Sequence, residues 1–253
     1  MMSSDRQIQR MAVQAMYNFY ERLTPPPNYQ SFIAGWRVMG KFVERMDHYI
    51  CAQLHKNTNP NERFPYVNFA IFQGSDHKVM DDFINPGPEL MAALIDAHGP
   101  PGHQVNFPGG YKEVATFDGL PIAPDLPPKL KSYFLMACFR PTDDGTADIE
   151  SFEHTWQEST GAAFLKKNNT PDLHVGNIGL YRLFTPPGPP YMSFPYVIRC
   201  ELNASQEGEM YAANQLLEQF KQVPVPHGFH RENAAIYRID PDNVLMSPIN
   251  HWD

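Results

Sequence analysis

The chain has 253 residues, of which 42% are hydrophobic and 19% are charged, so it is globular and long enough to bury a sizeable core. Its formal net charge of −8 gives no electrostatic support to a nucleic-acid or anionic-membrane partner. The three cysteines are too sparse for a disulfide framework, no HExxH or paired-cysteine metal motif occurs, and no apolar run approaches the ~18 residues of a membrane span.

The first half of the chain predicts the element order strand, helix, strand, strand, helix, strand. In the first helix, Phe32, Trp36 and Met39 recur at helical spacing. The second helix is expected after the helix-breaking Pro86 and Pro88. The strands are expected at 11–20, 48–55, 65–73 and 111–117, and the helices at 29–46 and 89–97.

The second half predicts the same order. Asp148 or Thr146 is a suitable N-cap for its first helix. The strands are expected at 133–140, 174–184, 194–202 and 233–239, and the helices at 149–167 and 206–222.

Four sequence matches, found in the same order in both halves, indicate a tandem duplication. Three of them lie 120 residues apart, and the fourth, Phe-Pro-Tyr-Val, lies 130 residues apart because the second half has a longer proline-rich loop. The matched sets are Ser31-Phe32 and Trp36 with Ser151-Phe152 and Trp156; Glu89 and Ala92-Ala93 with Glu209 and Ala212-Ala213; Val114 to Phe117 with Ala234 to Tyr237; and Phe64 to Val67 with Phe194 to Val197.

Each half therefore reads as a ferredoxin-like βαββαβ unit, and the fold class is α+β. We expect the first unit at 9–119, a proline-rich linker at 120–131, the second unit at 132–240 and a C-terminal tail at 241–253. Each sheet carries helices on one face only, so its other face must be covered. Packing the two bare faces together gives a pseudo-twofold α/β barrel with the helices outside.

The segment from Asp148 to Trp156 resembles the helix opening of the dimeric α/β-barrel superfamily, and most nearly that of EthD-like proteins: an acidic turn, then a Phe, then a Trp four residues later. Ser31-Phe32 and Trp36 repeat the motif in the first half. The resemblance implies a barrel that acts on a small organic molecule as a cofactor-free oxygenase, isomerase or cyclase, or that binds haem. Family members often carry a His one turn after the Trp, whereas this chain has Ser159-Thr160-Gly161 there.

The strand containing Tyr196 to Leu202 supplies the candidate catalytic residues. Strand side chains alternate between faces, so Val197, Arg199 and Glu201 share the face that points into the barrel. Burying two charged residues about 7 Å apart on a central strand costs free energy unless the charges are paired or hydrated. These two residues form a structural ion pair, or are exposed at the barrel rim, or make the polar end of a pocket. In such a pocket Arg199 orients an anionic or carbonyl group and Glu201 accepts a proton.

The corresponding strand of the first half is wholly apolar on its inward face. Val67, Phe69 and Ile71 lie there, and with Val197 we predict that they line the ligand pocket. Because one half is apolar and the other charged, the sequence favours a single pocket over two equivalent ones. Arginines late in other strands of the second half could add to an acidic-ligand site: Arg140, Arg182 and Arg238.

The ten histidines form no tight cluster, so we expect no metal site. We also expect no cofactor, with haem as the alternative. A haem protein would need an axial ligand, and His174, at the start of a strand, is one candidate.

The sequence leaves three hypotheses for function. The first is an enzyme acting on a small apolar or aromatic molecule, the second a non-catalytic ligand-binding or scaffold protein, and the third a haem-binding barrel. Since both bare sheet faces lie in one chain, we expect a monomer, or a dimer that is not needed for barrel closure. The polar first residues lack the apolar core of a signal peptide, so we expect a cytoplasmic protein.

Overall fold

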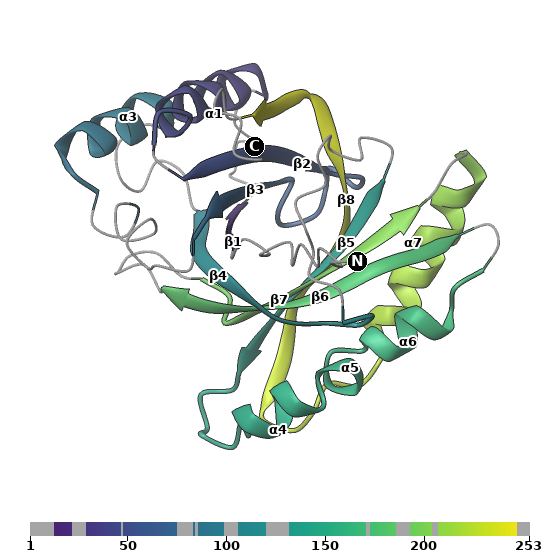
Figure 1. Cartoon of the computed structure of the whole chain (residues 1–253). Coiled ribbons are helices and arrows are strands. Elements are labelled where there is room, and N and C mark those ends of the chain that lie inside the picture. The colour runs from purple at the N-terminus through teal and green to yellow at the C-terminus, as the bar shows by residue number, and fades with distance from the viewer. Residues whose placement is uncertain are drawn as a thin grey trace, which may run out of the picture.

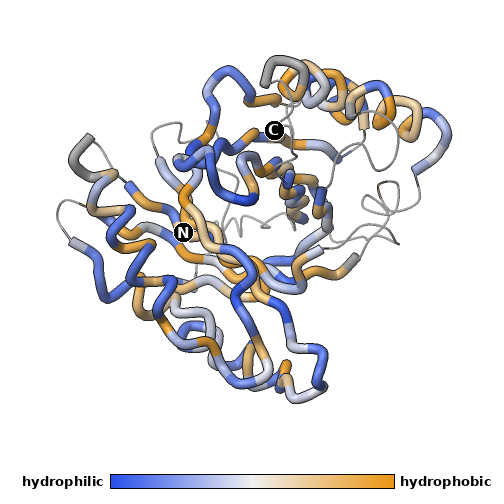
Figure 2. The backbone as a smooth tube through the Cα atoms, turned by 180° about the vertical axis from the view of Figure 1, so that it is seen from behind, coloured by the Kyte–Doolittle hydropathy of each residue, from blue (hydrophilic) through white to orange (hydrophobic). Residues whose placement is uncertain are grey.

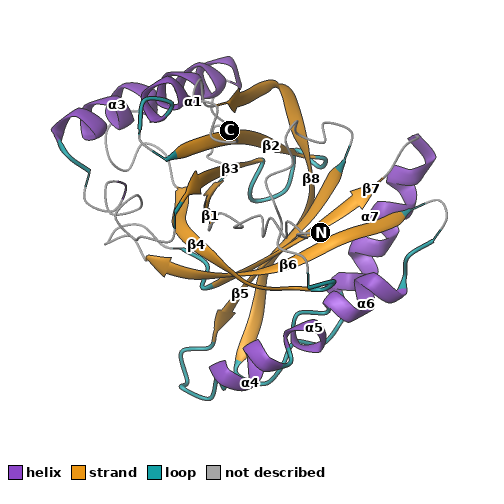
Figure 3. Ribbon diagram, in the orientation of Figure 1, coloured by secondary structure: helices purple, strands orange, loops and turns teal. Residues whose placement is uncertain are grey.

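The computed structural model describes residues 13–21, 29–46, 48–74, 83, 86–98, 106–119, 132–170, 173–185, 193–203 and 207–246. Eight strands in these residues form a closed barrel in the order β1-β3-β2-β8-β5-β7-β6-β4. Every neighbouring pair of strands is antiparallel. Figures 1 and 3 show the helices outside the ring of strands. The predicted α+β class and the barrel with outer helices are thus present.

The elements appear in the order that the sequence predicts. The first half contains β1 (Val13–Tyr20), α1 (Tyr29–Val43), β2 (Tyr49–Asn57), β3 (Tyr66–Gln73), α3 (Pro88–His98) and β4 (Asn106–Thr116). The second half contains β5 (Tyr133–Pro141), α4 (Ile149–His154), α5 (Trp156–Ser159), α6 (Ala162–Lys167), β6 (His174–Thr185), β7 (Tyr196–Asn203), α7 (Glu207–Lys221) and β8 (Phe229–Met246). The predicted linker at 120–131 lies outside the described residues.

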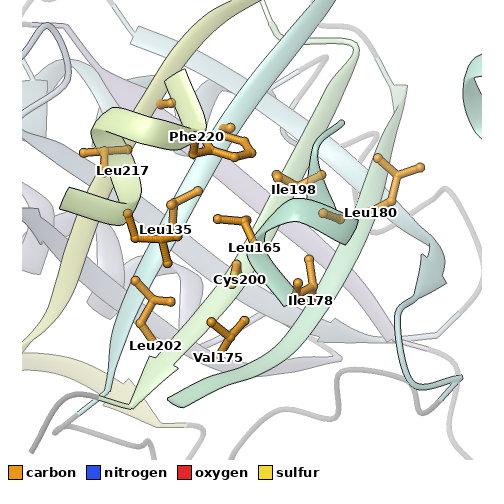
Figure 4. Packing of buried hydrophobic residues seen from close by; sticks show 14 of the residues in the cluster. Leu135, Leu165, Val175, Ile178, Leu180, Ile198, Cys200, Leu202, Leu217 and Phe220 are labelled. Carbon is orange, nitrogen blue, oxygen red and sulfur yellow. The ribbon is translucent and has the colours of Figure 1, made fainter. Parts of the chain in front are cut away.

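Alternating side chains divide the core into three layers. One buried cluster fills the barrel, and two others lie between the outer faces of the strands and the helices. Figure 4 shows the outer cluster of the second half, where Leu165 of α6 and Phe220 of α7 pack over apolar strand residues such as Ile198. In Figure 2 apolar and polar stretches alternate along the chain, as expected for strands and helices that bury one face. The repeated tryptophans, Trp36 and Trp156, both belong to the outer clusters.

The helix predicted at 149–167 is broken into three short helices. Asp148 caps the first of them as predicted, since its carboxylate accepts a hydrogen bond of 2.9 Å from the backbone N–H of Ser151. The α4 helix ends at Thr155, whose hydroxyl donates to the Ser151 carbonyl. Gly161 then adopts a φ of +81°, which favours glycine, before α6 begins.

In the first half, α3 packs closely against α1. A side-chain carbon at Gly35 would lie only 1.9 Å from the carbonyl oxygen of Ala97, so the contact between these helices requires glycine at that position. None of the described helices is long and apolar enough to cross a membrane.

Strand β8 differs most from its prediction, because it continues past Ile239 to Met246 into the segment expected to be a tail. Ile239 pairs with His55 and Val244 pairs with Gln53, so several residues around Pro241 bulge out between two stretches of regular pairing. Proline has no backbone N–H to donate and is tolerated in bulges. Arg37 of α1 holds the bulge by donating to the Asn243 side chain and the Asp242 carbonyl.

The pairing register also corrects one of the four sequence matches. Ala15 pairs with both Ile71 and Tyr111, and Phe134 pairs with both Glu201 and Tyr237. If the two Phe-Pro-Tyr-Val segments correspond, 130 residues apart, Ile71 corresponds to Glu201 and Tyr111 corresponds to Tyr237. Under the predicted duplication, the match of Val114 to Phe117 with Ala234 to Tyr237 is then out of register.

Candidate functional site

The inward face of β7 is arranged as the alternation predicts. Tyr196, Ile198, Cys200 and Leu202 lie in the outer cluster against the helices, and Val197 lies in the cluster that fills the barrel. Val67, Phe69 and Ile71 of β3 belong to the same inner cluster. Arg199 and Glu201 are each only 5% exposed. The four predicted pocket residues thus lie together inside the barrel.

Arg199 is held between two aromatic rings. Its guanidinium carbon lies 3.9 Å from the centroid of Phe134 and 4.8 Å from that of Phe69. Within the described part of the chain, no residue accepts a hydrogen bond from Arg199 Nε. Cation–π contacts offset only part of the cost of removing a charge from water. The site therefore contains a buried positive charge with unused hydrogen-bonding capacity.

Glu201 has different neighbours from Arg199. Its carboxylate accepts a hydrogen bond of 3.0 Å from the hydroxyl of Ser132, which also lies 3.1 Å from the Asn203 side-chain oxygen. Ser132 comes just before β5, so β5 and β7 together surround this carboxylate. Arg199 thus stacks on two rings, and Glu201 accepts a hydrogen bond from a hydroxyl.

His55 of β2 is a site residue that sequence reasoning missed. Its ring contacts the same two rings as Arg199, with centroids 5.2 Å from Phe134 and 6.0 Å from Phe69. Burial, and then the charge of Arg199, lower the pKa of His55 to about 3, so the imidazole is neutral at neutral pH. Its Nδ1 lies 3.3 Å from the Gln53 carbonyl oxygen, and among the described residues Nε2 has no hydrogen-bond partner.

Two tyrosines complete the surroundings of Arg199. Tyr17 of β1 packs against Phe69 with centroids 4.9 Å apart and meets Tyr181 of β6 edge to face at 5.4 Å. The Tyr181 hydroxyl donates to Glu113 Oε2 of β4 at 3.5 Å. The alternation of side chains along β1 and β2 also predicts that Tyr17 and His55 point inward, as it does for Arg199 on β7.

The additional arginines do not join this site. Arg140 pairs with Glu232, and Arg182 pairs with Glu153 of α4. Arg238 is exposed. Among the described residues no group of three or more His, Cys, Asp or Glu side chains is arranged to hold a metal ion.

Neither His174 nor His55 fits a haem site. His174 is exposed at the start of β6. His55 lies inside the barrel but is 0% exposed, and the rings of Phe69 and Phe134 press against it. A porphyrin could reach its Nε2 only by displacing these rings, and an axial ligand needs an open coordination face.

Comparison with known proteins identifies the fold and the family. A solved structure of an anthrone oxidase-like protein is 11% identical, with 94% of each chain covered and a TM-score of 0.56. A putative chlorite dismutase is 13% identical over 90% of this chain and 94% of the other, with a TM-score of 0.51. At such identity the likeness shows the shared fold alone, a closed antiparallel barrel with helices outside it.

No curated protein matches the chain. The family model described as a domain of unknown function, DUF7153, matches residues 49–223, which is more than half of the chain. The match runs from β2 to the end of α7 and so includes both Arg199 and His55. The chain therefore belongs to the DUF7153 family.

Proposed function

We propose that the barrel interior binds a small, largely apolar organic molecule and that Arg199 holds an anionic or carbonyl oxygen of it. The observation that carries the proposal is the burial of Arg199 between Phe69 and Phe134 without a hydrogen-bond acceptor for Nε among the described residues. A ligand oxygen would supply the acceptor, and guanidinium forms two parallel hydrogen bonds with a carboxylate. The aromatic walls suit a planar apolar body.

The polar groups around Arg199 support the same proposal. Tyr17 Oη and His55 Nε2 are buried and make no hydrogen bond of normal geometry with any described residue. Burial raises the pKa of Tyr17 and lowers that of His55, and the charge of Arg199 lowers the pKa of both side chains. Each unsatisfied buried polar group costs about 1–3 kcal/mol. Such groups gathered around one guanidinium are more economically explained by a missing ligand than by structural need.

We further propose that the chain is a tandem duplication of ferredoxin-like units whose halves have diverged to make one site. The strand register supports this duplication. When the pairing of β1 with β3 is superposed on that of β5 with β7, Phe69 corresponds to Arg199, and Ile71 corresponds to Glu201. Each half gives the local strand order last, first, third, second, which is the ferredoxin-like order. Only the second half contributes charge to the inward face of its third strand.

The proposed chemistry is that of a cofactor-independent oxygenase, isomerase or cyclase of the EthD-like kind. Glu201 would accept a proton from an acidic carbon of the bound molecule while Arg199 stabilises the resulting oxyanion. The name of one fold relative, an anthrone oxidase-like protein, is consistent with an oxidase. The alternative is a non-catalytic binding protein, in which Arg199 holds the ligand and Glu201 remains tied to Ser132.

The net charge and the closed barrel bear on possible partners. With a net charge of −8, we propose that the protein has no nucleic-acid or membrane partner. We also propose a cytoplasmic location. The barrel closes within one chain, so a second copy is not needed to complete it.

The test is a binding screen with small aromatic acids and phenols, followed by thermal shift and calorimetry. Arg199→Met should abolish binding of the compounds that the wild-type protein binds, whereas Arg238→Met, at an exposed arginine, should leave it unchanged. Compounds that lack an anionic or carbonyl oxygen should bind at least tenfold more weakly, as expected for loss of a charge-assisted pair. Equal binding to wild type and Arg199→Met would refute the proposal.

Turnover separates the enzyme from the binding protein. An enzyme should lose its activity in Glu201→Gln while its ligand affinity changes little. A binding protein should show no turnover in wild type under air or nitrogen. An absorbance spectrum after haem addition tests the haem hypothesis. A Soret band that depends on His55 would contradict the conclusion that His55 does not fit a haem site.

A further inference from the structure

We infer that Tyr17 and Tyr181 form a proton-transfer path that joins the Arg199 site to the carboxylate of Glu113. The inference rests on the proposed function, because it takes the ligand oxygen held at Arg199 as the source of the proton. It assigns a role to two buried tyrosines and a carboxylate that the proposed function leaves unused.

The contacts follow one another from β3 through β1 and β6 to β4 inside the barrel. Phe69, which stacks on Arg199, packs against Tyr17, and Tyr17 meets Tyr181 edge to face with ring centroids 5.4 Å apart. Tyr181 and Glu113 are direct partners in the pairing of β6 with β4, so their side chains point to the same face. The Tyr181 hydroxyl donates to Glu113 Oε2 at 3.5 Å.

Burial decreases along the same line. Tyr17 is 0% exposed and Tyr181 is 3% exposed, whereas Glu113 is only half-buried. Since the last group reaches solvent and the first does not, a proton entering at Tyr17 has an exit at Glu113. Glu201, by contrast, is nearly buried and accepts from Ser132.

Both tyrosines remain neutral, which suits a relay. Burial raises the pKa of Tyr17 and of Tyr181 well above the usual value, and the positive charge of Arg199 offsets only part of that rise. Each hydroxyl also affects the pKa of the other, and Glu113 and Tyr17 raise that of Tyr181 further. A neutral hydroxyl can accept one proton and donate another at the same time.

The other tyrosines inside the barrel show what a structural role looks like. The hydroxyls of Tyr111 and Tyr237 donate to the backbone carbonyls of Phe194 and Phe64 at 2.9 and 3.2 Å. The Tyr17 hydroxyl has no backbone anchor of this kind among the described residues, and the side-chain hydrogen bond that affects its pKa is with Tyr181. The hydroxyl at position 17 therefore does not serve to hold a backbone segment, as those of Tyr111 and Tyr237 do.

The step is a concerted transfer that conserves protons and electrons. A ligand O–H bond breaks and its proton passes to the Tyr17 oxygen, the Tyr17 proton passes to the Tyr181 oxygen, and the Tyr181 proton passes to Glu113. Both tyrosines end as neutral hydroxyls. The products are a ligand oxyanion beside Arg199 and a protonated Glu113, which exchanges its proton with water.

The experiment uses 4-nitrophenol as the probe, because its phenol and phenolate forms absorb at different wavelengths. The full chain is mixed with the probe in a stopped-flow instrument at a pH where free probe is mostly protonated. Binding to wild type should convert it to phenolate. Tyr17→Phe, Tyr181→Phe and Glu113→Gln should slow that conversion by about a hundredfold, the usual contribution of a positioned proton acceptor, while the dissociation constant changes little. Tyr237→Phe, which removes an interior hydroxyl outside the path, should retain the wild-type rate.

The outcomes separate the two proposals. Loss of phenolate formation in Arg199→Met together with wild-type rates in Tyr17→Phe and Tyr181→Phe would overturn the proton path and leave the proposed function standing. No binding of 4-nitrophenol to wild type, or binding that does not depend on Arg199, would overturn both. A slowed rate in the three path variants, with Tyr237→Phe unaffected, supports the path.

Discussion

The rings of Phe64 and Phe194 meet edge to face inside the barrel, with centroids 5.7 Å apart. These residues begin the two Phe-Pro-Tyr-Val segments, which are the strongest sequence match between the halves. Tyr237 donates to the Phe64 carbonyl and Tyr111 donates to the Phe194 carbonyl, so each half holds the segment of the other. Such a reciprocal contact is the arrangement of a twofold interface, in which the same patch faces itself.

This reciprocity predicts matched losses of stability. Tyr111→Phe and Tyr237→Phe each remove a buried hydrogen bond to a backbone carbonyl, and the Asn57 side chain still donates to that of Phe64. Each should lower the free energy of unfolding by about 0.5–1.5 kcal/mol. Urea denaturation would measure both, with Tyr211→Phe, at an exposed tyrosine, as the control. A loss in one variant and none in the other would contradict the reciprocal role.

The buried His55 predicts a dependence of stability on pH. Its pKa is about 3 in the folded protein, well below the ordinary value. Below about pH 6.5 the unfolded chain therefore binds a proton that the folded protein does not. Stability from neutral His55 is fully present above the unfolded pKa and is lost as pH falls toward 3, by about 1.4 kcal/mol per pH unit.

A matched comparison isolates this contribution. His55→Leu should lack the loss, so between pH 5.5 and 4.5 its stability relative to wild type should rise by about 1.4 kcal/mol. His174→Gln, at an exposed histidine, should follow the wild-type curve. Parallel curves for wild type and His55→Leu would show that His55 titrates in the folded protein near its ordinary pKa.

The three cysteines should be unreactive in the folded protein. Cys51, Cys138 and Cys200 are all buried, and burial raises the pKa of the Cys51 thiol to about 12 and holds the pKa of the other two thiols well above their usual range. Because the thiolate is the reactive form, iodoacetamide at pH 8 should label none of them rapidly. Mass spectrometry should find three labels after denaturation in urea, and rapid single labelling of the native protein would place one thiol at the surface.

Much of the site could be predicted because β7 is regular. Alternation from Tyr196 to Leu202 alone places Arg199 and Glu201 inward, and the uninterrupted pairing with β5 preserves it. The neighbours of Arg199 could not be derived in the same way. Phe134, His55 and Tyr17 come from three other strands, and strand alternation does not state which residues of different strands meet.

Bulges in the sheet explain the remaining differences between the predicted and the observed strands. The pairing of β6 with β7 shifts between Val175 and Ile178, and that of β2 with β8 shifts between Gln53 and His55. Under the proposed duplication, each shift changes the number of residues that separates a residue of the first half from its counterpart in the second half. The separation of 120 residues seen in three of the sequence matches therefore cannot hold along the whole chain. Around Pro241, the turn-forming residues Asp-Pro-Asp-Asn predict the end of a strand, whereas the strand bulges there and then resumes.

The most direct test of the central claim, that Arg199 is a buried charge kept for a ligand, is the free energy of unfolding of Arg199→Met without ligand. Met fills a similar volume between Phe69 and Phe134 and carries no charge to desolvate. The account predicts that the variant is more stable than wild type by about 1–3 kcal/mol, since a buried charge whose Nε has no acceptor among the described residues is replaced by an apolar group. A loss of stability of similar size would contradict it, because it would show that Arg199 is satisfied within the protein and contributes to the fold.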